Sequence, residues 1–274
     1  MHRLSRYVDA FAGLRLLRNP GAAVRHVVGL TRDGEVRYEL RNGLSLSLDA
    51  SPAGRRALLS IQEIFGREVY RIDDPGLGVI LDVGANIGLF AAFAAARCPG
   101  ARVHAFEPEP SNLAQLRRTL AANGLEQRVQ VYACAVAESA SGSVDLFLNA
   151  LNGRAHSIVA EKLEACHESK RLARDGVAKV SVPARSLAQV FVDCGIEHCD
   201  LMKMDIEGAE YGVLYSAPQS LLARIDRIFL ECHDLRRVDA RFEVGAMAEF
   251  LRASGFASVE CDGPYLRAAR IGRP

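Results

Sequence analysis

The sequence has no long hydrophobic run, no excess of charge of one sign and no paired cysteine motif. No apolar run approaches the roughly 18 residues of a transmembrane helix, so no membrane span is expected. The net charge of +1 and pI near 7.6 argue against a dedicated nucleic-acid binder, which carries a basic excess. Arginines interrupt the first apolar stretch and no small-residue cleavage site follows, so no secretory signal is expected.

The cysteines likewise lack the spacing of a disulfide framework or a zinc site. They number seven, which is odd, and none belongs to a C-x-x-C pair. Reduced thiols in the cytoplasm are the simplest interpretation. At 274 residues, 49% of them hydrophobic, the chain can build one sizeable core with a small extension.

Residues 1–70 are expected to form that extension. Helical spacing runs from the start to about residue 22, where "RNPG" is a turn signal. The Asn42-Gly43 turn, between alternating apolar residues, and a further Asp-Gly turn upstream predict a small antiparallel meander. A ribbon of this size is marginal alone, so residues 24–66 are predicted to pack on the main sheet or on a second subunit, as in a homodimer, and to help form a substrate pocket.

Strands and helices alternate in the main domain, residues 71–274. "GVILDVG", "ARVHAFEP" and "RVQVYACAV" have the character of buried strands, and helical segments separate them. This βαβαβ rhythm predicts a Rossmann-like α/β fold with a mostly parallel, doubly wound sheet. "FASVECDGPYLRAARI" adds a C-terminal antiparallel hairpin, "GSVDLFLN" is a candidate edge strand, and residues 149–178 are predicted to form a loop with one helix.

The first strand leads into the turn Gly84-Ala85-Asn86-Ile87-Gly88. A dinucleotide fingerprint needs glycine at the position of Asn86, so that the backbone can approach a pyrophosphate. No Gly-Lys-Ser/Thr follows, which argues against a P-loop. The turn suits a ligand without a phosphate at this point, such as the amino-acid end of S-adenosylmethionine; a purely structural turn is the alternative.

Glu107 ends the second strand, in "HAFEPEP". A carboxylate there can accept hydrogen bonds from both hydroxyls of an adenosine ribose. NAD sites use the same contact, so Glu107 indicates a ribose without distinguishing the cofactor. A solvated loop carboxylate is the alternative.

Four blocks in order, "DVGANIG", "FEPEP", "LMKMDIEGAE" and "FLECHD", resemble the motifs of the FkbM family of S-adenosylmethionine-dependent methyltransferases. The resemblance covers roughly residues 60–235. It implies a Rossmann-like class I methyltransferase fold and methylation of hydroxyl oxygens on sugars or natural products. The terminal hairpin agrees with it, because sheets of this class contain one antiparallel strand.

The resemblance also implies where the cofactor binds. The positions are Asp82, Gly84, Ala85, Asn86 and Gly88 at the turn, Glu107 and Pro108 at the ribose, Cys134 and Ala135 beside the adenine, and Asp205 at a later strand end. Two features depart from the family pattern. No acidic residue stands at the adenine position, so backbone groups are expected to meet the adenine amine, and Ala188 replaces the usual aspartate after Leu187.

Two later strand ends carry candidate catalytic groups. Period-2 alternation puts Asp205 and Glu207 on one side of "KMDIEG", together with Lys203, and Glu231 and His233 on one side of "IFLECH". Facing one crevice, they would form a carboxylate–histidine cluster in which His233 is the base and Asp205 or Glu231 orients it. Alternatively, these carboxylates hold a divalent cation, although no ligand set is complete, or the lysine and carboxylates form a structural ion pair.

Three functions remain open from the sequence. The first is an O-methyltransferase acting on a small molecule or glycan. The second, a nicotinamide-dependent oxidoreductase, fits poorly with Asn86 and with "MDIEGAE". The third is a non-catalytic S-adenosylmethionine-binding protein. Nucleic-acid base methylation is disfavoured because the sequence has no N/D-P-P-Y/F segment.

Overall fold

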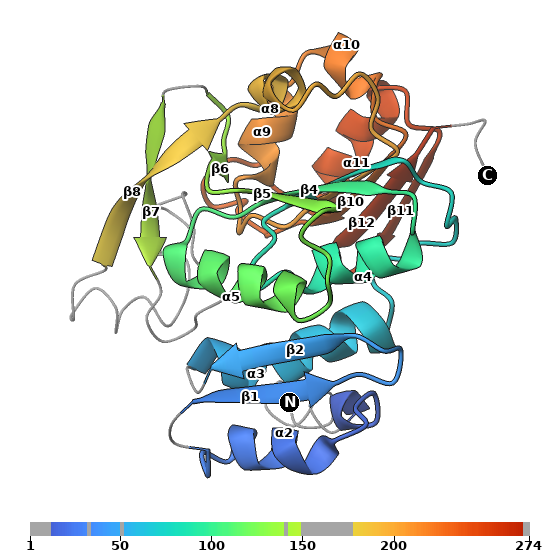
Figure 1. The fold of residues 1–274 in the computed structure, drawn as a ribbon. Helices are drawn as coiled ribbons and strands as arrows, with labels where there is room; N and C mark the ends of the chain where they lie inside the picture. The colour runs from blue at the N-terminus through green and yellow to red at the C-terminus, as the bar shows by residue number, and fades with distance from the viewer. Residues whose placement is uncertain (1–11, 32–33, 50–51, 140–141, 149–177, 271–274) are drawn as a thin grey trace.

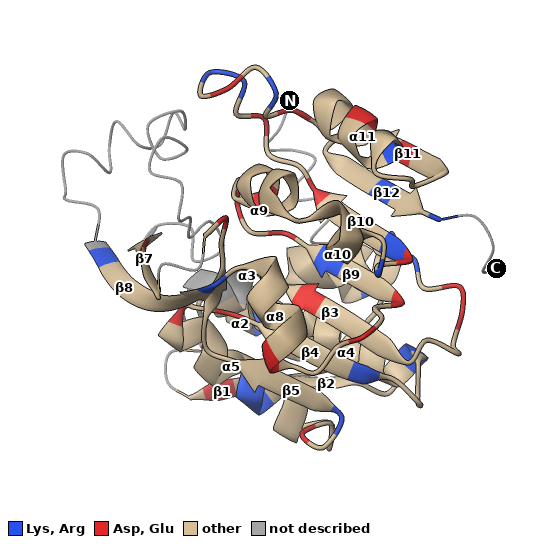
Figure 2. Ribbon diagram, turned by 90° about the horizontal axis from the view of Figure 1, so that it is seen from above, with Lys and Arg blue, Asp and Glu red and all other residues tan. Residues whose placement is uncertain are grey.

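The structure is a computed structural model that describes residues 12–31, 34–49, 52–139, 142–148 and 178–270. Nearly all of the segment predicted as a loop with one helix, residues 149–178, lies outside the described residues. Lys and Arg residues and Asp and Glu residues are interspersed along the ribbon, in agreement with the net charge of +1 (Figure 2). Among the described residues, no helix has the length and apolar character needed to span a membrane.

Seven strands form the central sheet, in the order β11–β12–β10–β9–β3–β4–β5 (Figure 1). They are β3 (Val79–Val83), β4 (Arg102–Phe106), β5 (Val129–Tyr132), β9 (Leu201–Met204), β10 (Arg227–Glu231), β11 (Ser258–Asp262) and β12 (Tyr265–Ala269). Five neighbouring strands of this sheet, β5, β4, β3, β9 and β10, are parallel to one another. Strand β12 is antiparallel to both of its neighbours, β10 and β11. The predicted Rossmann-like sheet with a C-terminal antiparallel hairpin is confirmed.

Helices cover both faces of this sheet (Figure 1). One face carries α4 (Leu89–Arg97) and α5 (Pro110–Ala121); the other carries α8 (Leu187–Asp193), α9 (Glu210–Ser216), α10 (Gln219–Leu222) and α11 (Val244–Ala253). The strands are apolar because both faces are buried: Ile80 packs into one core and Leu81 into the other. Strand order reverses between β3 and β9, which places the ligand-binding crevice at the carboxyl ends of these strands.

The N-terminal extension differs in part from its prediction. Its elements are α2 (Pro20–Val27), β1 (Glu35–Glu39), β2 (Ser45–Asp49), α3 (Pro52–Ile61) and a π-helical turn, η1 (Gln62–Gly66). The predicted meander is a two-stranded hairpin, because the segment before the upstream turn belongs to α2. "RNPG" was also misread: proline favours the first turn of a helix, and Pro20 begins α2.

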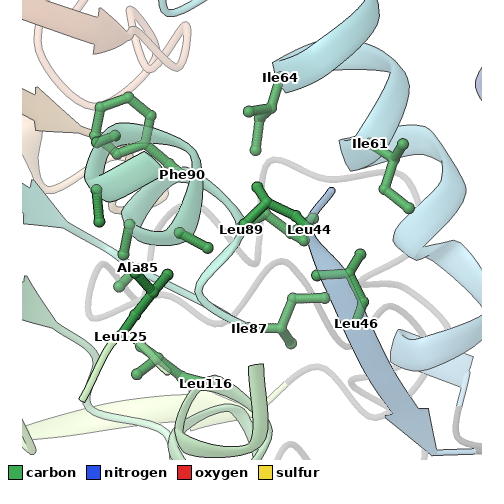
Figure 3. Packing of buried hydrophobic residues seen from close by; sticks show 14 of the residues in the cluster. Leu44, Leu46, Ile61, Ile64, Ala85, Ile87, Leu89, Phe90, Leu116 and Leu125 are labelled. Carbon is green, nitrogen blue, oxygen red and sulfur yellow. The ribbon is translucent and has the colours of Figure 1, made fainter. Parts of the chain in front are cut away.

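The extension packs on α4 and α5, which separate it from the sheet (Figure 3). Leu46 and Ile61 are fully buried and share one core with Leu116. The N–H of Ser45 donates a hydrogen bond to Oδ1 of Asn123 at 2.8 Å, and Nδ2 of Asn123 donates to the carbonyl oxygen of Ser45 at 2.7 Å. The extension therefore completes the main core, but residues 24–66 meet α4, α5 and the turn after α5, whereas they were predicted to meet the main sheet or a second subunit; their part in a substrate pocket stays a prediction.

Removing the extension is expected to destabilise the protein. A chain beginning at residue 70 would expose the apolar sides of α4 and α5, at about 1.5–3 kcal/mol for each large side chain uncovered. We expect aggregation, or a clearly lower melting temperature, by circular dichroism and sedimentation. Leu46→Ser should reproduce the loss, whereas Val28→Ser, at a side chain 61% exposed, should not. A truncated chain that is soluble, folded and fully active would contradict this prediction.

A small separate sheet stands beside the main one (Figure 1). Its order is β6 (Ala135–Val136), β8 (Ala178–Arg185) and β7 (Ser143–Leu148). "RVQVYACAV" is therefore two strands, because the chain leaves the main sheet after Tyr132, and the predicted edge strand β7 pairs with β8. This sheet brings Val136 and Leu146 to the crevice.

Candidate active site

A cleft opens at the carboxyl ends of β3, β4 and β9. The space between its walls, with the open solvent at its mouth included, is about 550 Å³. Its walls are Gly84, Asn86, Glu107, Pro108, Asn112, Ala135, Val136, Leu146, Asp205, Ile206 and Glu207. Most of the predicted cofactor contacts thus meet in one place, at the position where an open α/β sheet binds its ligand.

The turn after β3 is held in a left-handed conformation. Gly84 has φ 81° and Asn86 has φ 51°; asparagine is among the few residues that tolerate this region. The Asn86 side chain accepts a hydrogen bond from the N–H of Ile87 at 2.8 Å. A Cβ on Gly84 would lie 1.9 Å from the carbonyl oxygen of Asp205, so glycine is required where the two turns meet.

Glu107 is buried at the cleft wall, and backbone groups hold its carboxyl. Oε2 accepts from the N–H of Asn86 at 2.8 Å, and Oε1 accepts from the N–H of Glu109 at 2.9 Å. Burial raises the pKa of Glu107 to about 7, although these hydrogen bonds oppose the shift. The residue predicted to bind the ribose, Glu107, therefore has a carboxyl group whose position is already fixed by backbone hydrogen bonds.

Four predicted cofactor contacts lie behind the wall. Ala85, Gly88 and Cys134 do not line the cleft: Ala85 and Cys134 pack into the hydrophobic cores on either side of the sheet, and Gly88 begins α4 against Leu116. Asp82 is fully buried in β3, 3.2 Å from Nζ of Lys203.

Lys203 links Asp82 to the turn, because its Nζ also donates to the carbonyl of Gly84 at 2.7 Å. Burial raises the pKa of Asp82, and the nearby ammonium opposes that shift. Burial alone would lower the pKa of Lys203, but the carboxylates of Asp82 and Asp205 raise it. Asp82 therefore supports the turn from behind, in a structural ion pair, and does not meet a ligand directly.

The turn after β9 carries the acidic edge. β9 ends at Met204, so the predicted alternation does not reach Glu207, which has φ 58°. The chain turns because Glu210 accepts hydrogen bonds from the N–H groups of Ile206 and Gly208, both at 2.9 Å. Asp205 and Glu207 nevertheless both line the cleft.

His233 lies just beyond β10, between two carboxylates. Its Nε2 is 3.3 Å from Oε2 of Glu207, and its Nδ1 is 3.2 Å from Oε1 of Glu210. Tyr211 donates its hydroxyl to the His233 carbonyl at 2.9 Å. Glu207 and Glu210 thus flank the imidazole, and Asp205 has a carboxylate oxygen within 4.8 Å of a ring nitrogen, so the orienting role expected for Asp205 or Glu231 stays a prediction.

Glu231 forms a second acidic position beside the first. The pairing of Leu230 with Met204 places it next to Asp205. Burial and then the charge of Asp205 raise the pKa of Glu231 to about 8. On the other side of β10, Glu231 pairs with Tyr265 of β12. The ring of Tyr265 lies 6.4 Å from the ring of Tyr70, a residue of the segment after η1 that is only 5% exposed.

The donor set is a poor fit for a divalent cation. Asp205, Glu210 and His233 have candidate ligand atoms within 4.8 Å of one another. Oε1 of Glu210 already accepts from the N–H of Ile206 and lies 3.2 Å from Nδ1 of His233, so a cation between Glu210 and the imidazole would have to displace one of these contacts.

Sequence reasoning missed several site residues. Asn112, Val136, Leu146 and Ile206 line the cleft, and Glu210 supports it from behind. Glu210 was visible inside "DIEGAE", but Val136 and Leu146 depended on a sheet that the pattern did not reveal.

Comparison with known proteins assigns the family. The methyltransferase FkbM domain matches residues 82–258. The AMB antimetabolite synthetase AmbE of Pseudomonas aeruginosa is 34% identical over 71% of this chain, which spans only 10% of AmbE. The 31-O-demethyl-FK506 methyltransferase FkbM of Streptomyces tacrolimicus is 31% identical, over 70% of this chain and 78% of that protein.

Among solved structures, methyltransferase FkbM from Methylobacillus flagellatus has 13% sequence identity and a TM-score of 0.46, over 92% of this chain and 59% of its own. The sequence match alone covers more than half of the chain. The protein therefore belongs to the FkbM family of S-adenosylmethionine-dependent methyltransferases.

Proposed function

We propose that the protein transfers a methyl group to a hydroxyl oxygen of a sugar, glycan or other natural product. The observation that carries this proposal is the imidazole of His233, held by Glu207 and Glu210 beside the cleft. A hydroxyl proton must leave during methyl transfer, and a positioned imidazole is the side chain best matched to that task near neutral pH.

The cleft residues fit S-adenosylmethionine. Gly84 and Asn86 would border its amino-acid end, Glu107 its ribose hydroxyls, and Ala135 and Val136 its adenine. When bound, this group supplies an activated methyl. The protein then has to align the acceptor, exclude water and take the proton.

The acceptor side is acidic. Asp205 and Glu231 are adjacent, and the ammonium of Lys203 beneath them is engaged by Asp82 and a backbone carbonyl. The Asp205 carboxylate accepts hydrogen bonds from hydroxyls and repels anions, and the Glu231 carboxyl, which its pKa of about 8 keeps mostly protonated at neutral pH, can donate or accept; both favour an uncharged or cationic acceptor. The name of the Streptomyces relative, a 31-O-demethyl-FK506 methyltransferase, describes an oxygen acceptor for that protein and supports this proposal.

Three further predictions accompany this function. We propose a cytoplasmic location, which the free cysteines among the described residues support. A homodimer and a catalytic cation stay predictions. The family assignment decides against the nicotinamide-dependent oxidoreductase, whereas a non-catalytic binding role is separated from catalysis by experiment.

The direct test is methyl transfer to a panel of hydroxylated acceptors. Purified protein, S-adenosylmethionine and sugars, polyols or macrolide alcohols should yield S-adenosylhomocysteine and a product heavier by one methylene, with the methyl on oxygen by NMR. Cofactor binding without any turnover would favour the non-catalytic alternative. A methyl group found on nitrogen or carbon would contradict O-methylation.

Glu107 predicts how nucleoside affinity depends on pH. With a pKa near 7, its carboxyl is ionised above pH 7 and protonated below it, and the ionised form accepts from both ribose hydroxyls. Adenosine, which does not titrate in this range, should bind about tenfold more weakly at pH 6 than at pH 8. Calorimetry on Glu107→Gln should show a flat pH profile and a loss of about 1–3 kcal/mol at pH 8. Unchanged affinity would refute the ribose assignment.

A further inference from the structure

Glu210 begins helix α9 and contacts two separate parts of the active site. It is fully buried, at 0% exposure. Oε2 accepts from the N–H of Gly208, while Oε1 accepts from the N–H of Ile206 and lies 3.2 Å from Nδ1 of His233. One carboxylate thus ties the turn after β9 to the imidazole after β10.

These contacts define where the imidazole carries its proton. A carboxylate oxygen only accepts hydrogen bonds, so Nδ1 of His233 must be the donor to Glu210. In the neutral imidazole the other nitrogen, Nε2, then carries the lone pair. Nε2 faces the carboxylate of Glu207, which by the same rule would favour a proton on Nε2. The two carboxylates differ in how firmly they are held: Glu207 stands at the cleft wall with 20% of its side chain exposed, where solvent or an acceptor can replace it, whereas Glu210 is fully buried and fixed by two backbone N–H groups. Glu210 is therefore the partner that sets the tautomer.

We propose that Glu210 is a positioning residue that holds His233 in the Nδ1–H tautomer, which makes Nε2 the atom that accepts the proton of the acceptor hydroxyl. This inference rests on the proposed O-methyl transfer, and it names the basic atom and the group that selects it. Nε2 would take the hydroxyl proton as the O–H bond breaks and the acceptor oxygen bonds the methyl carbon; the methyl–sulfur bond of S-adenosylmethionine would break with its electron pair left on sulfur, giving S-adenosylhomocysteine as the leaving group. The imidazolium that results keeps its Nδ1–H on Glu210, whose negative charge stabilises it.

The chain contains an internal reference for the tautomer. His198 lies at the opposite end of β9, with its Nε2 2.8 Å from Oδ2 of Asp226. The carboxylate therefore selects Nε2–H in His198 and Nδ1–H in His233, so one spectrum should contain both tautomers.

The experiment is long-range ¹H–¹⁵N NMR of imidazole-labelled full-length protein bound to S-adenosylhomocysteine, at a pH where both rings are neutral. We expect Nδ1–H for His233 and Nε2–H for His198. In Glu210→Gln, which keeps the shape and loses the charge, the tautomer ratio of His233 should fall about tenfold or more, the loss expected for a charge-assisted hydrogen bond. His198 should not change.

Nε2–H as the main tautomer of His233 in the wild type, or an unchanged ratio in Glu210→Gln, would overturn the proposal. If the variant does not fold, the wild-type tautomer alone decides. A merely structural role for Glu210 would lower the melting temperature and leave the tautomer unchanged. Failure of O-methylation in the acceptor panel is a separate result, because the tautomer is measured without an acceptor.

Discussion

His233→Ala is expected to lower the rate of methyl transfer about 10²- to 10⁴-fold, the usual contribution of a positioned general base. An acceptor hydroxyl has a pKa far above neutral, so water would have to replace the imidazole as base. His233 does not line the cofactor cleft, and S-adenosylmethionine affinity should therefore stay within a few-fold. The measurement is single-turnover transfer to the acceptor from the panel, beside calorimetry of cofactor binding.

His198→Ala is the matched control. That imidazole also rests on a carboxylate, but at the other edge of the sheet, so transfer should be unchanged. Asp205→Asn tests the acceptor wall and should also lower the rate. Near wild-type rates in both His233→Ala and Asp205→Asn would show that this edge is structural and that alignment alone drives the reaction.

A chelator separates base catalysis from cation catalysis. Both oxygens of Glu210 are engaged, so we expect activity to survive chelation. Activity lost with the chelator and restored by Mg²⁺ or Mn²⁺ would establish the cation route instead.

Gly84→Val is expected to prevent folding of the nucleotide-binding half. Because the turn would border a ligand, one interpretation is that a valine there clashes with the bound ligand. The structure instead places the clash inside the protein, because a Cβ on Gly84 would lie 1.9 Å from the carbonyl oxygen of Asp205 and 3.0 Å from the side chain of Ile206. Gly84 also has a φ of 81°, which is a left-handed conformation. A backbone carbonyl cannot move away as a flexible side chain can, so we expect even Gly84→Ala to lower the free energy of unfolding by several kcal/mol. About 1–2 kcal/mol of this loss comes from the left-handed conformation alone.

The measurement is denaturant unfolding of Gly84→Ala beside Gly100→Ala. A Cβ at Gly100 meets nothing within 4 Å, so that variant is the control and should be near neutral. Gly84→Ala with wild-type stability and lost cofactor affinity would restore the ligand-clash interpretation.

The sequence alone determined the sheet and the main binding positions, because both depend on local patterns. Apolar strands alternating with helical segments specify a doubly wound sheet. Glycines and strand-end acids mark its ligand edge, so the sequence pointed to Gly84, Asn86, Glu107 and Asp205, which line the cleft; that they bind the cofactor stays a prediction.

Only the tertiary structure decided which groups meet across elements. Alternation could not show that β9 ends at Met204, because the chain is turned there by Glu210, which accepts hydrogen bonds from the N–H groups of Ile206, four positions before it, and Gly208. Nor could it show that His233 rests on Glu210, since those residues are 23 positions apart and belong to different elements. Side-chain contacts between strand ends depend on how the turns are held, and that is set by packing rather than by periodicity.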